Sequence, residues 1–377
     1  MAKGDLWTDI SHAFWRITMN LQVSRFQFFS IVLNFIIYSS ILMAPGITVI
    51  NAKQDGWLSM LLALGVGLAA NFLYLMLFKK HGYPSLFELM DRSAGKWIGT
   101  ALNIVIVFYA LHLTAMVVRN LSNFMITDVS PYSSPYIYQI LILLVVAYTS
   151  YHGVKNLFLI SELFTPFISL FVIGSLIVII KHFKIIELKP FFYNPPSAIL
   201  EGAYSTLGFP FIEIMLAGAF LTYVKRKDKL VSIALSAIAI GGAVLVITVI
   251  LVIGNDSAYI VARESYPTYS VMRDVSLTTT FKRVEIIIGI AWIIGLFFKI
   301  STCFCVAMMG IKHLSKSKTF RGYIVPCAIL VWAMSNGLHK TFIDFTNFVS
   351  MDWTLYWFTL YSFVIITMLI GLARKRA

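Results

Sequence analysis

Two charged side chains of opposite sign lie inside long apolar stretches of the sequence, where a charge is costly. Glu213 belongs to the run at about 202–223, and Lys299 belongs to the run at about 284–310. A charge near the centre of a bilayer costs at least roughly 2–3 kcal/mol on insertion scales, so it needs a partner or a polar cavity. We therefore expect a buried ion pair between Glu213 and Lys299. Such a pair either fixes helix packing or belongs to a functional site.

Two other stretches hold residues that interrupt a helix, and both lie in apolar runs. The first run carries Tyr38-Ser39-Ser40 and then Ala44-Pro45-Gly46, and the run at 202–223 carries Gly208-Phe209-Pro210-Phe211. Proline removes a backbone donor, and glycine tolerates unusual dihedral angles. Inside a bilayer the freed N–H and C=O groups must line a protein-enclosed cavity, where they can bind a polar ligand or an ion. Each stretch alone fits a simple proline kink, but two at matching places favour a binding site.

Further polar side chains in apolar runs are candidates for the walls of this site. Tyr109 and His112 lie in the third run, and Thr302 lies in the eighth. His112 has no second histidine one turn away, so we do not expect it to bind a metal. The candidate ligand-binding residues are Tyr38, Ser39, Ser40, Tyr109, His112, Gly208, Phe209, Phe211, Glu213, Lys299 and Thr302.

The composition predicts a polytopic α-helical membrane protein. Of the 377 residues, 59% are hydrophobic and only 12% are charged, and the mean hydropathy is +0.83. A water-soluble domain usually has about 25% charged residues. The apolar runs are continuous rather than alternating, which excludes a β-barrel. We find no nucleophile–base set, phosphate-binding loop or metal-ligand motif, so we expect no enzymatic activity, no catalytic residues, no metal and no cofactor.

Ten stretches are apolar over a length that crosses the hydrocarbon, which needs roughly 20 residues. Trp57, Trp97 and Trp353 fall at the ends of such stretches, as interfacial anchors do. The predicted spans are about 27–50, 57–78, 97–118, 135–151, 157–180, 202–223, 230–253, 284–310, 322–339 and 352–372.

Most of the 30 Lys and Arg residues fall in alternate loops and at both chain ends, which places both termini in the cytoplasm. The net charge of +13 thus reflects membrane orientation rather than nucleic-acid binding. An even number of spans with helix breaks in spans 1 and 6 predicts a five-plus-five inverted repeat. We expect the domains to be an amphipathic cytoplasmic segment at 1–22, a permease-like domain at 23–372 with repeats at about 23–180 and 202–372, and a basic cytoplasmic tail at 373–377.

Several short motifs together give the sequence a family resemblance that covers about residues 20–375. It resembles the spore germination receptor B subunit of the GerAB/GerKB type, in the spore permease family of the APC superfamily. The motifs are the stretch Val23-Ser24-Arg25-Phe26-Gln27-Phe28-Phe29, Pro45, Asp55-Gly56-Trp57, the segment from Gly153 to Glu162, and Phe209-Pro210-Phe211-Ile212-Glu213.

This resemblance implies an APC/LeuT-like fold and a place in the inner membrane of bacterial endospores. It also implies two partners, a membrane-bound A subunit and a lipoprotein C subunit, and a small-molecule germinant, often an amino acid, bound at the mid-membrane site. Relatives usually carry a Gly-x-Gly pattern in the first break, where this chain has Tyr38-Ser39-Ser40. Tyr38 would fill part of the space that glycine leaves open and would offer a hydroxyl group instead.

The residues themselves leave other functions open. An ion-coupled secondary transporter of amino acids or related small organic solutes would use the same two breaks and Glu213. A structural subunit with a degenerate pocket would also fit the missing glycines. Uptake of a labelled solute by the isolated chain separates the transporter from the sensor.

Overall fold

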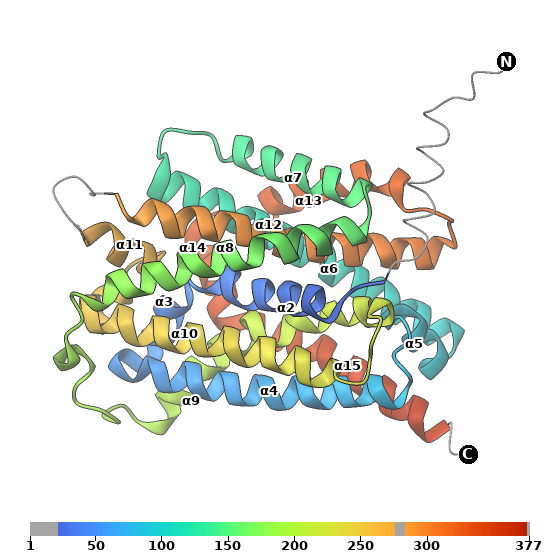
Figure 1. Ribbon diagram of the computed structural model, residues 1–377, viewed down its shortest axis with the longest axis horizontal. Helices are drawn as coiled ribbons and strands as arrows, with labels where there is room; N and C mark the ends of the chain where they lie inside the picture. Colours follow the sequence, from blue (N-terminus) through green and yellow to red (C-terminus); the bar gives the residue numbers. More distant parts are fainter. Residues whose placement is uncertain (1–21, 276–282, 375–377) are drawn as a thin grey trace.

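The computed structural model describes residues 22–275 and 283–374, and its regular structure there is helical apart from one isolated backbone bridge. The long helices lie side by side along one axis (Figure 1). The predicted amphipathic segment at 1–22 lies outside the described residues except for its last residue, and so does most of the tail at 373–377. The membrane-crossing elements are α2 (Arg25–Ser40) with α3 (Ala44–Ala52), α4 (Gly56–Lys80), α6 (Lys96–Phe124), α7 (Pro135–Tyr151), α8 (Val154–Ile180), α9 (Pro196–Thr206) with η4 (Leu207–Ile212) and η5 (Glu213–Tyr223), α10 (Leu230–Val261), α12 (Glu285–Ser315), α13 (Arg321–Gly337), and α14 (Phe342–Asn347) with η6 (Phe348–Asp352) and α15 (Trp353–Arg374).

Seven helices in the described part of the chain are by themselves long and apolar enough to cross a membrane. One of them joins α3 to α4 through η1 (Lys53–Asp55), where the chain reverses its direction (Figure 1). The shorter helices α7, which is apolar, and α13 have 17 residues each, which is about 26 Å of helix. The 16-residue α2 is continued by α3. These pieces together account for the ten predicted spans.

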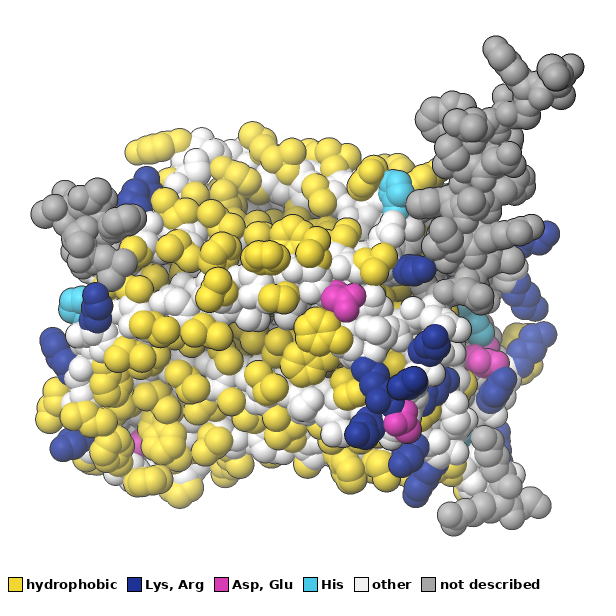
Figure 2. All heavy atoms as spheres, viewed as in Figure 1, with side chains coloured by type: hydrophobic (Ala, Val, Ile, Leu, Met, Phe, Trp, Pro, Cys, Tyr) yellow, Lys and Arg dark blue, Asp and Glu magenta, His cyan; other side chains and the backbone are white. Residues whose placement is uncertain are grey.

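The outer surface of the bundle is apolar between two charged ends. On α8, Leu163, Leu170 and Ile177 recur every seven residues, and each exposes about 60% of its surface. Exposed aliphatic side chains at this spacing form a lipid-facing stripe. Most of the visible Lys and Arg side chains gather at the end of the molecule where α2 begins and α15 ends (Figure 2). We call this end the basic end.

Besides η1, three shorter helices and one helical turn lie outside the predicted spans. They are α5 (Leu86–Ala94), η2 (Met125–Val129), η3 (Ile185–Leu188) and α11 (Pro267–Asp274). The last span also begins earlier than predicted, at residue 342 rather than 352, because α14 and η6 precede α15 without a gap. Polar residues in this entry segment hide it from a search for apolar runs.

The two interrupted helices run antiparallel and are tied together at the basic end (Figure 1). Ser24 caps α2 with a reciprocal capping box to Gln27, so the helix begins at a defined residue. Just before it, the Val23 N–H donates to the Tyr223 carbonyl at 2.9 Å, and the Lys225 N–H donates to the Val23 carbonyl at 3.0 Å. The start of α2 is thereby joined to the end of η5.

Candidate functional site

The first predicted break lies between α2 and α3. Helix α2 ends at Ser40, residues 41–43 form a turn, and α3 begins at Ala44 with a proline in its first turn. A turn inside a span frees backbone groups that would otherwise bond along the helix. The Ile41 carbonyl accepts a hydrogen bond of 2.6 Å from the Thr268 hydroxyl, which belongs to the short helix α11. The break is thus stabilised by α11, a buried helix that lies outside the predicted spans.

The second predicted break lies in η4. Phe209 has extended dihedral angles (φ −113°, ψ 105°) directly before Pro210. The freed groups again find partners on other helices: the Gly208 N–H donates to the Thr354 Oγ1 at 2.9 Å, and the Phe211 carbonyl accepts from the Asn71 Nδ2 at 2.7 Å. A Cβ at position 208 would lie 2.6 Å from the Thr354 Cα, so only glycine fits there.

The predicted ion pair between Glu213 and Lys299 is confirmed. The two side chains are in contact, and each is 0% exposed. The Lys299 ammonium also donates to the Ser39 Oγ at 2.8 Å, and the Trp353 Nε1 donates to the second Glu213 oxygen at 3.2 Å. We call Ser39, Glu213, Lys299 and Trp353 the central network. It joins both helix breaks to α12 and α15.

Two aromatic rings flank the ammonium of this network. The Lys299 Nζ lies 4.6 Å from the centroid of the Phe35 ring and 4.8 Å from that of the Phe209 ring. A desolvated cation is attracted to the negative face of an aromatic ring at such distances. The buried charge is therefore compensated by a carboxylate, a hydroxyl group and two rings, so the cost of its desolvation is largely offset.

Next to the central network lies a small cavity of about 20 Å³. That volume holds roughly one water molecule. The structure thus has a hollow between the two breaks, but in this arrangement it is nearly closed. Its lining residues are Ser39, Met43, Leu113, Met116, Val117, Asn120, Phe209, Phe345, Val349 and Trp353.

Six of the predicted binding residues lie at or near this cavity. Ser39 and Phe209 line the cavity. Lys299 contacts Ser39, and Glu213 contacts Trp353, on the side of these residues that faces away from the cavity. Ser40 is buried beside Ser39, with 3.3 Å between the two hydroxyl oxygens. Gly208 lies at the second break, where its N–H is bound by Thr354.

Tyr38 and Phe211 are absent from the cavity lining, because their side chains pack on other helices. A Cβ added at Gly295 of α12 would lie 2.0 Å from the Tyr38 Cβ. A Cβ added at Gly67 of α4 would lie 2.6 Å from the Phe211 Cβ. Each glycine therefore accommodates a large ring by close approach. Tyr38 does not fill the space that we expected it to fill in the first break.

Tyr109 and His112 form a cluster with Tyr356 of α15, and the centroid of the His112 ring lies 5.8 Å from that of the Trp353 ring in the central network. The Tyr109 hydroxyl donates to the Tyr356 carbonyl at 3.0 Å, and the His112 Nδ1 lies 2.7 Å from the Tyr356 hydroxyl oxygen. The rings of Tyr109 and Tyr356 stack at 4.1 Å between centroids. Thr302 is buried one turn from Lys299, and its hydroxyl has no hydrogen-bond partner among the described residues. None of these three lines the cavity.

Sequence reasoning missed the residues that close the site. We predicted Trp353 as an interfacial anchor, and this is wrong, because the side chain is 2% exposed and donates to Glu213. We expected spans 3 and 8 as walls: span 3, which is α6, does line the cavity, whereas α12 of span 8 does not, and the α14–η6–α15 segment lines it instead. Span 8 contributes through Lys299 alone. In the described residues, no group of three or more His, Cys, Asp or Glu side chains is placed to hold a metal ion.

The chain is similar to known spore germination proteins along most of its length. The sequence profile of the family described as "Spore germination protein" matches residues 22–343. Spore germination protein KB of Bacillus subtilis (strain 168) is 24% identical over 331 residues, covering 86% of this chain and 87% of that protein. Spore germination protein A2 of the same organism is 28% identical over 287 residues, covering 74% and 76%.

Solved structures of transporters share the fold. MhsT in complex with L-phenylalanine superposes with a TM-score of 0.67 at 12% identity, covering 93% of this chain and 98% of that one. Mhp1, a nucleobase–cation symporter in a closed conformation with bromovinylhydantoin bound, superposes with a TM-score of 0.60 at 11% identity, covering 87% and 75%. The predicted APC/LeuT-like fold with broken helices 1 and 6 is confirmed by these likenesses and by the two breaks described above.

Proposed function

This chain belongs to the spore germination protein family, and we propose that it senses a small-molecule germinant at the mid-membrane site between its two helix breaks. It is a multi-pass membrane protein with a transporter-like fold. The observation that carries the proposal is the central network, where a fully buried ion pair connects both breaks. Buried charges beside interrupted helices are typical of substrate sites in this architecture.

The ligand class follows from the charges of the network. A zwitterion such as an amino acid carries one charge of each sign, so its ammonium can replace Lys299 at Glu213 and its carboxylate can replace Glu213 at Lys299. When the ligand's two charges take over the partners of Glu213 and Lys299, no buried charge is left unpaired. This exchange therefore costs far less free energy than separating Glu213 from Lys299 without a ligand. MhsT, which shares the fold, was solved with L-phenylalanine bound, and this supports an amino acid as the ligand here.

Signalling by this site would be a shift between two helix arrangements. The cavity of about 20 Å³ is too small for an amino acid, so the ligand must bind an arrangement in which the walls stand further apart. A ligand that binds only this wider arrangement raises its population. The widened bundle then acts on the partners, which we propose to be the membrane A subunit and the lipoprotein C subunit. The role is binding rather than catalysis.

The proposal extends to the membrane in which the chain lies and to its orientation there. We place it in the spore inner membrane with both termini in the cytoplasm. The gathering of Lys and Arg at the basic end supports this orientation, because cytoplasmic loops carry an excess of cations (Figure 2).

The experiment is germination of spores that carry this chain and its receptor partners, with the twenty standard amino acids as probes. Ser39→Val removes the hydroxyl that binds Lys299 and adds bulk to the cavity, so the effective germinant concentration should rise at least about tenfold. The matched control is Ser30→Val on the same helix, where the buried hydroxyl has no hydrogen-bond partner among the described residues. Both variants are first checked for normal abundance in spore membranes.

Two results would overturn the proposal. An unchanged dose response of Ser39→Val, with the protein present at the wild-type level, would show that the germinant does not bind at this site. Wild-type spores that respond to none of the twenty amino acids would remove the ligand class.

The transporter alternative is favoured by the fold, since the similar solved structures are transporters. Proteoliposomes that contain this chain alone separate the two functions. Accumulation of labelled L-phenylalanine inside them would identify a carrier, and binding without accumulation supports the sensor.

A further inference from the structure

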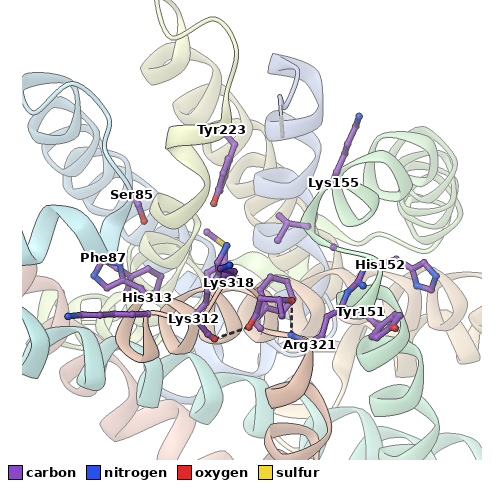
Figure 3. A pocket seen from close by; sticks show the side chains of 17 residues that line it. Ser85, Phe87, Tyr151, His152, Lys155, Tyr223, Lys312, His313, Lys318 and Arg321 are labelled. Carbon is purple, nitrogen blue, oxygen red and sulfur yellow. Dashed lines mark hydrogen bonds between the residues drawn. The ribbon is translucent and has the colours of Figure 1, made fainter. Parts of the chain in front are cut away.

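A large pocket opens at the basic end, well away from the central network. Its volume is about 660 Å³. Figure 3 shows that its side chains come from α5, from η5, from the turn between α7 and α8, and from the end of α12 and the segment that leads into α13. No part of the pocket belongs to the mid-membrane site, so what it binds is independent of the proposed germinant.

The pocket is lined by cations and contains no carboxylate among its lining residues. The basic lining residues are His152, Lys155, Lys312, His313, Lys316, Lys318 and Arg321. Two of them have partners: His313 pairs with Asp91 at 2.6 Å, and the Arg321 guanidinium lies over the Tyr151 ring at 4.6 Å.

The four lysines form no ion pair with any residue in the described ranges 22–275 and 283–374. Uncompensated like charges around one hollow create a positive potential that attracts an anion.

A second hollow, an apolar groove of about 380 Å³, lies between α7 and α13. In Figure 1 these two helices lie next to each other on the outer surface of the bundle. The groove is lined by Ile140, Leu143, Leu144, Ala147, Val325, Ala328, Ile329 and Trp332.

The helical register connects the groove to the pocket. On α7, Leu144 and Ala147 of the groove precede Tyr151 of the pocket at intervals of three and four residues. On α13, Val325 and Ile329 of the groove follow Arg321 of the pocket at intervals of four residues. Residues three or four apart share one helix face. The groove therefore lies on the same faces of α7 and α13 as Tyr151 and Arg321 of the pocket.

We propose that this pocket and groove bind one phospholipid with an anionic headgroup. The phosphate lies among Lys312, Lys316 and Lys318, and an acyl chain lies in the groove between α7 and α13. The occupant has to be anionic at one end and apolar along its length, and it has to be accessible from the bilayer. A phospholipid of the cytoplasmic leaflet meets all three conditions, and basic pockets between membrane helices recognise such headgroups.

The experiment uses the full chain, purified in detergent and stripped of native lipid. Native mass spectrometry measures its affinity for phosphatidylglycerol. Lys312→Glu combined with Lys318→Glu should weaken this affinity at least about tenfold, because each lysine near an anionic lipid contributes roughly a factor of five. The matched control is Lys79→Glu combined with Lys80→Glu, which reverses two exposed charges in the last turn of α4 without touching the pocket. This control should bind like the wild type.

Additional arms separate the lipid from a free phosphate. Ala147→Trp fills the groove and should reduce phosphatidylglycerol binding while leaving binding of soluble glycerol phosphate unchanged. Phosphatidylcholine, which has no net charge, should bind to the wild type at least about tenfold more weakly than phosphatidylglycerol. All variants are compared only if their melting temperatures without lipid match that of the wild type.

Four results would overturn the proposal. Equal binding of phosphatidylglycerol and phosphatidylcholine would show that the cations do not read the headgroup. Wild-type affinity in the lysine double variant would remove the pocket. Full competition by glycerol phosphate, together with no effect of Ala147→Trp, would identify a soluble anion as the ligand. Loss of a co-purified receptor subunit in the lysine variant, without any lipid binding to the wild type, would identify a protein interface.

Discussion

The centre of the bundle and its basic end both contain lysines, but the surroundings of the positive charge differ between the two regions. At the centre, Lys299 is fully buried and is compensated by Glu213, Ser39 and two aromatic rings. At the basic end, lysines such as Lys316 are exposed, and they share a wide pocket with no carboxylate in its lining.

The difference shows that the position of a charge decides what it can do. A desolvated pair acts over contact distance only, and removing one partner leaves the other charge buried and unpaired. Solvated charges at the end of the bundle act together over about 8 Å at physiological salt and are individually dispensable for folding. The centre is thus suited to selection of a ligand, and the basic end is suited to attraction of an anion.

The largest expected effect comes from breaking the buried pair. Lys299→Met should lower the free energy of unfolding by about 3–5 kcal/mol, because Glu213 is left buried without a counter-charge. The matched control, Lys316→Met in the basic pocket, should leave it unchanged. Thermal and denaturant unfolding in detergent measure both.

The double variant Lys299→Met with Glu213→Leu tests the same point from the other side. Removal of both charges should restore most of the lost stability, since replacing a buried pair by apolar residues is often neutral. No recovery in the double variant would show that the pair is not the source of the loss.

A second test concerns packing density, which differs between the two regions. Gly295→Ala at the centre should destabilise by about 1–3 kcal/mol, because its new Cβ would lie 2.0 Å from the Tyr38 Cβ. Gly322→Ala, at the basic end, is the control, since a Cβ there meets no atom within 4 Å. Melting temperatures that fall equally in both variants would contradict the contrast.

The third test isolates one hydrogen bond of the central network. Trp353→Phe should cost about 2 kcal/mol of unfolding free energy, because Glu213 loses a donor at 3.2 Å. Trp357→Phe removes a buried indole N–H that has no hydrogen-bond partner among the described residues. The two substitutions remove similar volume, so a difference in unfolding free energy between them reports the hydrogen bond. Equal losses would mean that packing alone is measured.

The smallest expected effect belongs to an exposed ion pair at the basic end. The hydrogen bond from Arg25 holds the pKa of Asp228 below its ordinary value of 3.8. A carboxylate with a lowered pKa stabilises the fold above its ordinary pKa, and this contribution disappears as the pH falls through the lowered value. Asp228→Asn should therefore melt slightly below the wild type at pH 7 and equally with it under strongly acidic conditions. A gap that persists in acid would contradict this assignment.

Sequence alone predicted the features that depend on local residue types. Pro45 and Pro210 marked both breaks because proline and glycine act on the backbone wherever they stand. Glu213 and Lys299 were found as a pair because an isolated charge in an apolar run demands a partner. The APC/LeuT-like fold followed from these two signals, from the number of spans and from the family resemblance.

The rest of the site depends on contacts between distant segments and on rotation about helix axes. Trp353 reaches Glu213 across 140 residues, and nothing local to either residue records that contact. Asp344 and Asp352 lower the hydropathy at the beginning of the last span. The predicted start of this span was therefore ten residues too late, and the part of the cavity wall that lies before residue 352 was missed. Tyr38 and Ser39 are neighbours, but a helix turns about 100° per residue, so one packs on α12 while the other lines the cavity.

The tie between Val23 and the end of η5 gives the two interrupted helices a common pivot. Two backbone hydrogen bonds hold them together at the basic end. A rocking motion about such a fixed point displaces the far halves, α3 and α9, through the longest arc. A change that breaks contacts in the central network would therefore displace α3 and α9, at the end of the bundle opposite the tie, the most.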